Sequence, residues 1–319
     1  MKPFKTLDEQ IEILEKRGLT IDDKEKAKNY LLEYSYYNVI NVYSKFFQYS
    51  ENKYIPNASF NEIRSVHLFD QEIKSILFKY LIECEKHFKS IIAYRFSEYH
   101  KDIPFAYLQT SSYSSNDLLG LATTISILSK VILAETRSQK QNAIKHYYNN
   151  HTDVPLWVLN NKLTFGQVVK MYKQFDSKLK NNIAKDIAKY LSDNLNAQII
   201  LEPKELENIL FNLVEIRNCV AHNNHLFDYT CKNHIKYIKE IHEPLMITKK
   251  SPRQNVFNNI LAMQTLLNKE QYALMHNTIL KRSKTLNNKL SSISIDVILS
   301  KLGFPNNWLL KTERIKQTS

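Results

Sequence analysis

The sequence predicts an all-α fold, and three observations lead to that prediction. The 319 residues contain only four glycines and eight prolines, which leaves few of the positive-φ positions that hairpins and sheet corners require. Capping boxes, in which Ser or Thr is followed three residues later by Glu or Gln, recur before apolar segments. Those segments keep a period near 3.6 residues. A chain of this length can bury a large core, as one domain or as two.

Two helices are predicted at the N-terminal end. Thr6 opens a capping box before an amphipathic segment that Gly18 ends. Asp22 or Asp23 caps a second helix. We expect this second helix to continue, buried, through the aromatic stretch at 33–49.

A long helix follows from a second capping box, formed by Ser59 and Glu62, and is expected to reach about Tyr99. Its apolar residues recur at helical spacing: Ile63, Val66, Phe69, Ile73, Ile76, Leu77, Tyr80, Leu81 and Cys84. Residues 102–116 contain Pro104 and little periodicity, which predicts a loop.

The rest of the chain is predicted to be helical with short breaks. The expected helices cover residues 117–136, about 140–149, a segment capped by Thr164, a lysine-rich segment capped by Asp176, about 204–223, about 229–242, and basic helices after residue 252. The breaks are at 151–157 and at the Pro-flanked linker 243–252. We therefore divide the chain into an all-α region, 1–245, and a basic segment, 246–319, packed on the same body.

The net charge of +12 is concentrated in two stretches. Residues 246–319 hold twelve Lys or Arg against three acids, and residues 162–189 hold seven Lys against two Asp. The C-terminal stretch also carries Tyr272, Phe304 and Trp308. Cations displace condensed counterions and aromatic rings stack on unpaired bases, so this composition suits a polyphosphate partner. The alternative is a lysine-rich solvated surface.

Cysteine usage and the N-terminal sequence bear on localisation. Cys84, Cys219 and Cys231 are an odd number without a framework spacing, which favours a reducing compartment, the cytoplasm. No apolar export signal follows the initial Met, and the longest weakly polar run, Leu118 to Leu128, is too short to span a membrane. We expect no membrane association.

The stretch EIRNCVAHNNH at 215–225 carries the candidate chemistry. On a helix, Asn218 and His222 share one face, whereas Arg217 lies about 140° around the axis from His222. One copy of the motif therefore does not converge on a single atom. Two copies across a two-fold axis bring two Arg and two His into one cleft, which predicts a homodimer or a higher even oligomer.

These residue types suit cleavage of RNA without a metal or other cofactor. Imidazole can take the proton of a 2′-hydroxyl or protonate the leaving 5′-oxygen, and guanidinium binds the phosphate oxygens on which charge accumulates. Products would carry 2′,3′-cyclic phosphate, and DNA would resist cleavage. The alternative is a surface histidine and a helix-end arginine paired with Glu215.

A zinc site is a further alternative. Cys219, His222, His225, Cys231 and His234 form the pattern C-x2-H-x2-H-x5-C-x2-H, and all five are zinc-capable ligands. The pattern lacks the two separated knuckles of usual zinc modules. A stoichiometric metal in the purified protein would overturn the metal-free mechanism.

Four ordered blocks of the sequence resemble a known family. They are FKTLDEQIEILEKRGL at 4–19, HLFDQEIKSILFKYLIECEKHFKSIIAYRF at 67–96, PLWVLNNKLTFGQVVKMYK at 155–173 and EIRNCVAHNNHLFDY at 215–229. They look like the Abi-like family of bacterial abortive-infection proteins, the group that includes AbiD and AbiF. The likeness covers about residues 5–230.

That family is similar to the HEPN superfamily, whose all-α domains cleave RNA without metal in a dimeric site. The resemblance implies a HEPN-like helical bundle with additional N- and C-terminal helices. It implies Arg217 as the transition-state phosphate ligand, Asn218 as an orienting neighbour and His222 as general acid/base. It also implies phage defence by RNA cleavage, in some relatives as the toxin of a toxin–antitoxin pair restrained by a small noncoding RNA.

Two positions depart from the family pattern. Where the family usually has arginine four residues after Glu85, this chain has Lys89, which lacks the bidentate fork and binds phosphate less firmly. His225 stands where relatives often carry an auxiliary arginine, and a protonated His225 would partly replace it. We expect both to contact RNA, together with five cations of the C-terminal segment: Lys249, Lys250, Arg253, Lys281 and Arg282.

Two other functions compete with the nuclease. In the first, the protein binds a structured small RNA without cleaving it, through Arg217 and the C-terminal lysines. In the second, it is a helical interaction or sensor protein whose polar motif is structural. The nucleic acid that copurifies with the protein, with its ends mapped, would separate these hypotheses.

Overall fold

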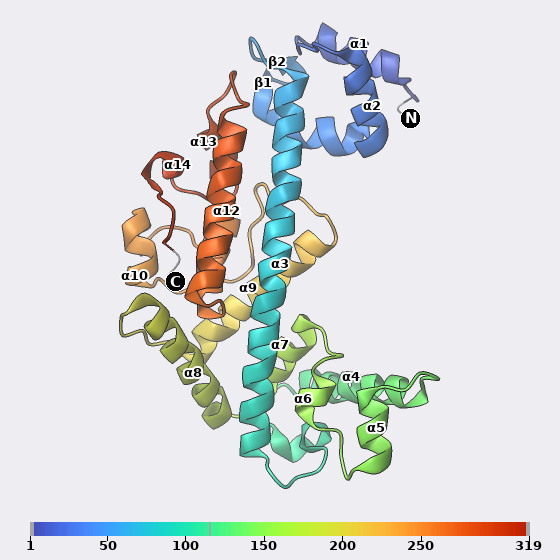
Figure 1. Ribbon diagram of the computed structural model, residues 1–319, viewed down its shortest axis with the longest axis vertical. Helices are drawn as coiled ribbons and strands as arrows, with labels where there is room; N and C mark the ends of the chain where they lie inside the picture. Colours follow the sequence, from blue (N-terminus) through green and yellow to red (C-terminus); the bar gives the residue numbers. More distant parts are fainter. Residues whose placement is uncertain (1–2, 115, 317–319) are drawn as a thin grey trace. The chain divides into compact units, whose positions relative to one another are not determined.

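A computed structural model describes residues 3–114 and 116–316 of the chain, and these residues are largely helical (Figure 1). Within the described residues, the sheet structure consists of one antiparallel pair, β1 (Gln48–Ser50) and β2 (Lys53–Tyr54). The prediction of an all-α fold is confirmed.

The chain divides into two compact units, each formed by separate segments. The first unit contains Met1–Leu77, Val220–Tyr229 and Ala273–Ser319, and the second contains Phe78–Cys219 and Thr230–Tyr272. Three helices pass from one unit to the other: α3 (Phe60–Tyr99), α9 (Pro203–Ala221) and α12 (Lys269–Asn287). The predicted border at 245/246 does not coincide with these units, because the chain crosses between them several times.

The first unit begins with two helices that pack on each other, α1 (Leu7–Lys16) and α2 (Lys24–Tyr34). The predicted capping box is present: Glu9 donates its N–H to Thr6 Oγ1 at 3.2 Å, and Thr6 donates its N–H to Glu9. The C-terminal helices of this unit are α13 (Ile295–Ser300) and α14 (Trp308–Lys311).

The predicted continuation of α2 through the aromatic stretch is wrong. Ser35 adopts a left-handed φ of +65° at the end of α2, which breaks the helical hydrogen-bond ladder. A π-helix, η1 (Tyr37–Asn41), and a 3₁₀ helix, η2 (Ser44–Phe47), follow before β1. Tyr43 and Phe47 are fully buried, so packing of these rings stabilises a path that local helix propensity does not specify.

Helix α3 begins at the predicted capping box and runs for 40 residues, as expected. Glu62 accepts from the Ser59 N–H at 3.0 Å. Its other carboxylate oxygen accepts from the N–H groups of Ser291 and Ser292, both at 2.8 Å. Through these hydrogen bonds Glu62, which is 2% exposed, connects the start of α3 to the segment before α13.

The second unit contains the remaining helices. They are α4 (Leu118–Arg137), α5 (Ala143–Asn150), α6 (Leu156–Leu159), α7 (Phe165–Gln174), α8 (Ser177–Leu195), α10 (Lys239–His242) and α11 (Val256–Ala262), with the 3₁₀ helices η3 (Ala106–Leu108), η4 (Thr110–Ser112), η5 (Glu243–Leu245) and η6 (Met263–Thr265). Thr164 and Asp176 cap α7 and α8, as predicted. Phe88 of α3 packs edge-on against Phe165 and Tyr172 in the core of this unit.

The helix predicted over 229–242 is wrong except for its last turn, α10. Asn212, fully buried in α9, donates to the carbonyl of Asn233 at 2.8 Å and accepts from its N–H at 3.1 Å. Thr230 pairs with Asn255 in an isolated antiparallel bridge. These tertiary hydrogen bonds hold the segment extended, because they use backbone groups that a helix would pair internally.

Candidate active site

Helix α9 carries the motif. Pro203 occupies its first position, where the missing N–H is not needed, and the N–H of Glu202 is bonded by Glu205 at 2.8 Å. One face of the helix is buried: Leu206, Ile209, Leu210, Leu213 and Ile216. The helix is therefore fixed along its length, and its polar face carries Arg217 and Asn218.

The helix ends at Ala221, just before His222. Asn223 takes the left-handed conformation that stops helices, with φ of +53°, and donates its N–H to the Val220 carbonyl at 3.2 Å. The side chain of Asn223 accepts a hydrogen bond from Lys74 at 3.1 Å. Asn223 thus fixes where the helix ends.

The guanidinium of Arg217 is partly buried beside α3. Its Nε lies 3.9 Å from Glu85 Oε2, and its Cζ lies 6.0 Å from the centre of the Phe78 ring. Nε is shielded from water and has no hydrogen-bond acceptor among residues 3–114 and 116–316. An unpaired buried N–H costs about 1–3 kcal/mol, so Arg217 keeps bonding capacity that the fold does not use.

Glu85 joins Arg217 to Lys89. The Lys89 ammonium lies 2.7 Å from Glu85 Oε1 and donates to the Leu163 carbonyl at 2.5 Å. The side chains of Glu85 and Lys89 are 12% and 16% exposed. Two of the three donors of the ammonium are therefore engaged within the protein, and the carboxylate balances two cations.

A cavity of about 740 Å³ opens beside this cluster, within the second unit. Its wall includes Glu85, Lys86, Lys89 and Arg217, so three cations and one carboxylate face it. Trp157 and Tyr94 also line it. The cavity is large enough for a small-molecule or nucleotide ligand, and its charge favours an anionic one.

Asn218 and His222 are both exposed to solvent. Asn218 Oδ1 lies 3.5 Å from a terminal nitrogen of Arg217, at the limit of a hydrogen bond. Arg217 and Asn218 belong to the second unit, whereas His222 belongs to the first. The structure thus brings Arg217 and Lys89 together around Glu85, places Asn218 beside Arg217, and leaves the His222 imidazole open to solvent.

His225 is exposed but lies near a charged cluster of the first unit. The centroid of its ring lies 6.4 Å from that of Tyr43, in an edge-on arrangement. Partial desolvation lowers the pKa of His225, the positive charges of Lys74 and Lys45 lower it further, and Asp70 opposes them. His225 is therefore mostly neutral at pH 7, which makes it a poor substitute for an auxiliary arginine.

The possible zinc ligands differ in accessibility. Cys219 and Cys231 are buried, whereas His222, His225 and His234 are exposed. Cys231 contacts the carbonyl of Asn212 and accepts from Asn259 at 3.5 Å, and desolvation raises the pKa of its thiol to about 12. Zinc binds thiolate, so binding at Cys231 would require this buried thiol to lose its proton. In the part of the chain that the structure describes, no three His, Cys, Asp or Glu side chains are grouped to hold a metal ion.

Of the predicted RNA-binding cations of the second unit, Lys249 and Lys250 are exposed in a turn and do not line the cavity. Arg253 is 6% exposed. Its Nε donates to the Ile235 carbonyl at 2.9 Å, and a terminal nitrogen donates to the carbonyls of Thr248, Lys249 and Ser251. Arg253 thus stabilises the loop by bonding its carbonyls from the buried side. We do not include it among the proposed RNA contacts.

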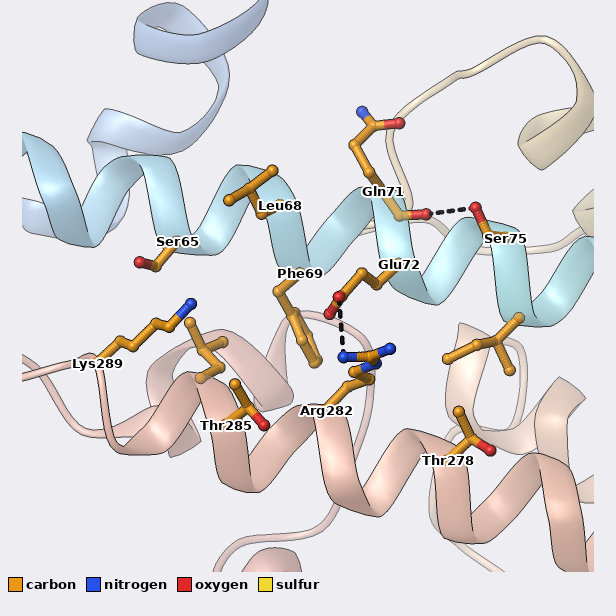
Figure 2. Close-up of a pocket in the computed structure, with 12 residues that line it drawn as sticks. Ser65, Leu68, Phe69, Gln71, Glu72, Ser75, Thr278, Arg282, Thr285 and Lys289 are labelled. Carbon is orange, nitrogen blue, oxygen red and sulfur yellow. Dashed lines mark hydrogen bonds and ion pairs between the residues drawn. The ribbon is translucent and has the colours of Figure 1, made fainter. Parts of the chain in front are cut away.

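The other two predicted cations lie on α12 in the first unit. Lys281 is exposed. Figure 2 shows Arg282 reaching from α12 to Glu72 of α3, with a separation of 3.2 Å. A cavity of about 420 Å³ lies between these helices, with Lys289, Thr278 and Thr285 also along it (Figure 2). Arg282 is therefore already paired, whereas Lys281 is available at the surface.

The aromatic residues of the C-terminal stretch do not form a stacking surface. Tyr272, Phe304 and Trp308 are 9%, 4% and 3% exposed. The expectation that these rings stack on bases is wrong, because they belong to the core. The exposed rings that line the cavity with Arg217 are Tyr94 and Trp157, at 63% and 55%, which reasoning from sequence missed. The block PLWVLNNK carried Trp157, but exposure cannot be read from it.

Helix α4 is longer than the apolar run that the sequence indicated. It continues to Arg137, and by length and composition it could cross a membrane. Leu121, Leu128 and Ile132 are buried, and α4 packs on α5 and α7. A core helix of a folded protein meets the same criterion, so α4 is weak evidence for a membrane span.

Comparison with known proteins places the chain in a family. The model of the Abi-like protein family matches residues 29–228, more than half of the chain, and this match includes Glu85, Arg217 and His222. No curated protein and no solved structure matches the chain. Membership implies a role in abortive infection, a form of defence against phage. By this match, the chain belongs to the Abi-like protein family.

Proposed function

We propose that the chain is a metal-independent endoribonuclease of the HEPN type that acts in phage defence in the cytoplasm. The observation that supports this best is the position of Arg217. Its guanidinium lies on the wall of a positively charged cavity and has an N–H without an acceptor among the described residues. Arginine in such a position is suited to bind a phosphodiester, because its planar fork matches the phosphate oxygens.

In the proposed mechanism Arg217 stabilises the transition state. Negative charge accumulates on the equatorial oxygens of the phosphorus as the 2′-oxygen attacks. Glu85 and Phe78 hold the guanidinium from one side, and Asn218 is next to it in the helix. Asn218 orients the substrate or the histidine.

His222 acts as general acid/base. Its imidazole takes the 2′-hydroxyl proton while the 2′-oxygen bonds to phosphorus, or protonates the 5′-oxygen as its bond to phosphorus breaks. The products are a 2′,3′-cyclic phosphate and a 5′-hydroxyl. Arg217 lies on α9 beside the cavity, whereas His222 follows the end of that helix and is exposed, so we propose that two chains form each composite site.

The protein is further proposed to be the toxin of a pair in which a small noncoding RNA restrains it. Exposed Lys249, Lys250 and Lys281 are the cations proposed to bind this RNA, together with His225. Each phosphate contact of this kind makes binding weaker as salt concentration rises.

The decisive experiment compares cleavage by the wild-type protein, Arg217→Ala and His222→Ala. We expect losses of about 10²–10⁴-fold, as for the removal of a general acid/base or a charge-stabilising donor. His234→Ala and Arg137→Ala are matched controls outside the motif, and they should cleave like wild type. Product ends are mapped for cyclic phosphate, with and without a chelator. Retained cleavage in both motif variants would show that this mechanism is wrong.

A non-catalytic RNA-binding protein is the second candidate, favoured by the exposed lysines of the C-terminal segment. It predicts tight, salt-dependent binding of a defined small RNA and no cyclic phosphate ends on any RNA. A protein that carries no nucleic acid and binds none would instead support a helical sensor or interaction protein.

A further inference from the structure

The cavity beside Arg217 has two exposed aromatic rings on its wall. Trp157 is 55% exposed and Tyr94 is 63% exposed, although rings of this size usually bury most of their surface. Trp157 is on α6 and Tyr94 is on α3, and both belong to the second unit. Arg217 lines the same cavity.

Trp157 is held in place by its neighbours rather than by its own burial. Leu156, Val158 and Leu159 of α6 are buried, which leaves residue 157 on the open side of a single helical turn. Asn160 then connects α6 to α3, because its Nδ2 donates to the Lys89 carbonyl at 2.9 Å. The backbone that carries the indole is therefore fixed, while the ring itself remains exposed.

The polar groups of the cavity suit a nucleotide. Lys86, Lys89 and Arg217 face it against the single carboxylate of Glu85, which favours a phosphate. Asn160 is 3% exposed and lines the cavity, and its Oδ1 has no hydrogen-bond donor among the residues that the structure describes. Both unpaired atoms, Asn160 Oδ1 and Arg217 Nε, are shielded from solvent, so the phosphate is proposed to contact the cations on the cavity wall rather than these atoms.

We propose that this cavity binds an unpaired base of single-stranded RNA next to the phosphodiester that is cleaved. The base stacks on Trp157, and its phosphate is directed toward Arg217. Stacking on an aromatic ring requires a base outside a duplex, so the substrate class is single-stranded RNA or a loop. The proposal rests on the proposed function for the position of the cleaved bond, but not for the binding itself.

The two tryptophans of the chain provide a direct probe, since Trp308 is buried and Trp157 is exposed. The full-length His222→Ala protein, which should not cleave, is titrated with a short unpaired RNA and with the same RNA annealed to its complement. We expect the unpaired RNA to quench the tryptophan fluorescence with saturation and the duplex not to. Equal quenching by both, or none by either, would overturn the proposal.

Variants in the same background measure the contribution of the ring. Trp157→Ala should weaken binding of the unpaired RNA about tenfold, consistent with stacking on one base. Trp157→Phe should lose the quenching but retain binding, which excludes a folding defect. Tyr148→Ala, at an exposed tyrosine of α5 that does not line the cavity, should bind like the parent. Unchanged binding by Trp157→Ala would overturn the proposal.

Cleavage by the otherwise wild-type protein separates this proposal from the proposed function. Quenching without any cyclic phosphate product would overturn the nuclease and support the base-binding cavity. Cyclic phosphate product without quenching would support the nuclease and overturn the cavity.

Discussion

Helix α3 carries two acid–lysine pairs with the same spacing, and their environments differ. Asp70 and Lys74 form one pair at 2.6 Å, and Glu85 and Lys89 form the other at 2.7 Å. The first pair is 1% and 6% exposed, and the second is 12% and 16% exposed. The same four-residue pattern thus produces a sealed ion pair in one unit and a pair at an open cavity in the other.

The partners explain what each pair does. Asp70 accepts from the Tyr43 hydroxyl at 2.7 Å, and Lys74 donates to Asn223 at the end of α9. The charged groups of this buried network are therefore paired with other groups of the protein. Glu85 instead lies 3.9 Å from Arg217 and lines a cavity. Charges that contact a cavity remain available to a ligand, so the second pair is the one that the proposed function uses.

The largest effect is expected for Asp70→Ala, which leaves Lys74 buried without its counterion. Removing one member of a buried pair destabilises a protein by about 3–5 kcal/mol. Urea unfolding measures the change. In the double variant Asp70→Leu/Lys74→Met no charge is left unpaired, and we expect it to regain most of the lost stability. A loss below about 1 kcal/mol in the single variant would mean that the pair is not sealed.

Glu85→Ala should affect activity more than stability. Water reaches this cluster through the cavity, so we expect a loss of about 1 kcal/mol in unfolding free energy. Cleavage should fall about tenfold, because Arg217 loses the carboxylate that holds it in position. Glu83→Ala, which removes the partly exposed partner of Lys86, is the matched control. Equal cleavage by both variants would contradict a positioning role for Glu85.

The smallest effect is expected on the pH dependence of stability. It involves His67, which lies one helical turn before Asp70 in the buried network. Burial lowers the pKa of His67, Asp70 raises it and Lys74 lowers it, with a net decrease. Below the ordinary histidine pKa the unfolded chain therefore binds a proton that the folded chain does not, and stability falls as pH decreases through about 6.5 and below.

Urea midpoints at pH 7.5 and 5.5 test this difference. The wild type should be less stable at pH 5.5, and His67→Gln should reduce that pH difference by on the order of 1 kcal/mol. His222→Gln changes an exposed histidine and serves as the control. An unchanged pH difference in His67→Gln would show that His67 does not contribute to acid sensitivity.

Local signals determined the positions of most helices. Thr6, Ser59, Thr164 and Asp176 each mark a helix start, and each does so through a side chain that bonds a backbone N–H three residues away. The motif was placed on a helix in part correctly, because Arg217 and Asn218 lie on α9 whereas His222 follows its end. These features depend on residues close in sequence, so the sequence by itself was sufficient for them, as it was for the all-α class.

The burial of residues outside the periodic apolar faces was decided by the tertiary structure. Arg253 and Trp308 looked like RNA-binding residues in a basic segment, yet both are enclosed. The segment 229–242 looked helical, but Asn212 holds it extended. Burial and hydrogen bonding of this kind depend on residues far apart in the chain, such as Trp157 and Arg217 on one cavity. Helical periodicity records which face of a helix is apolar, not what that face will meet.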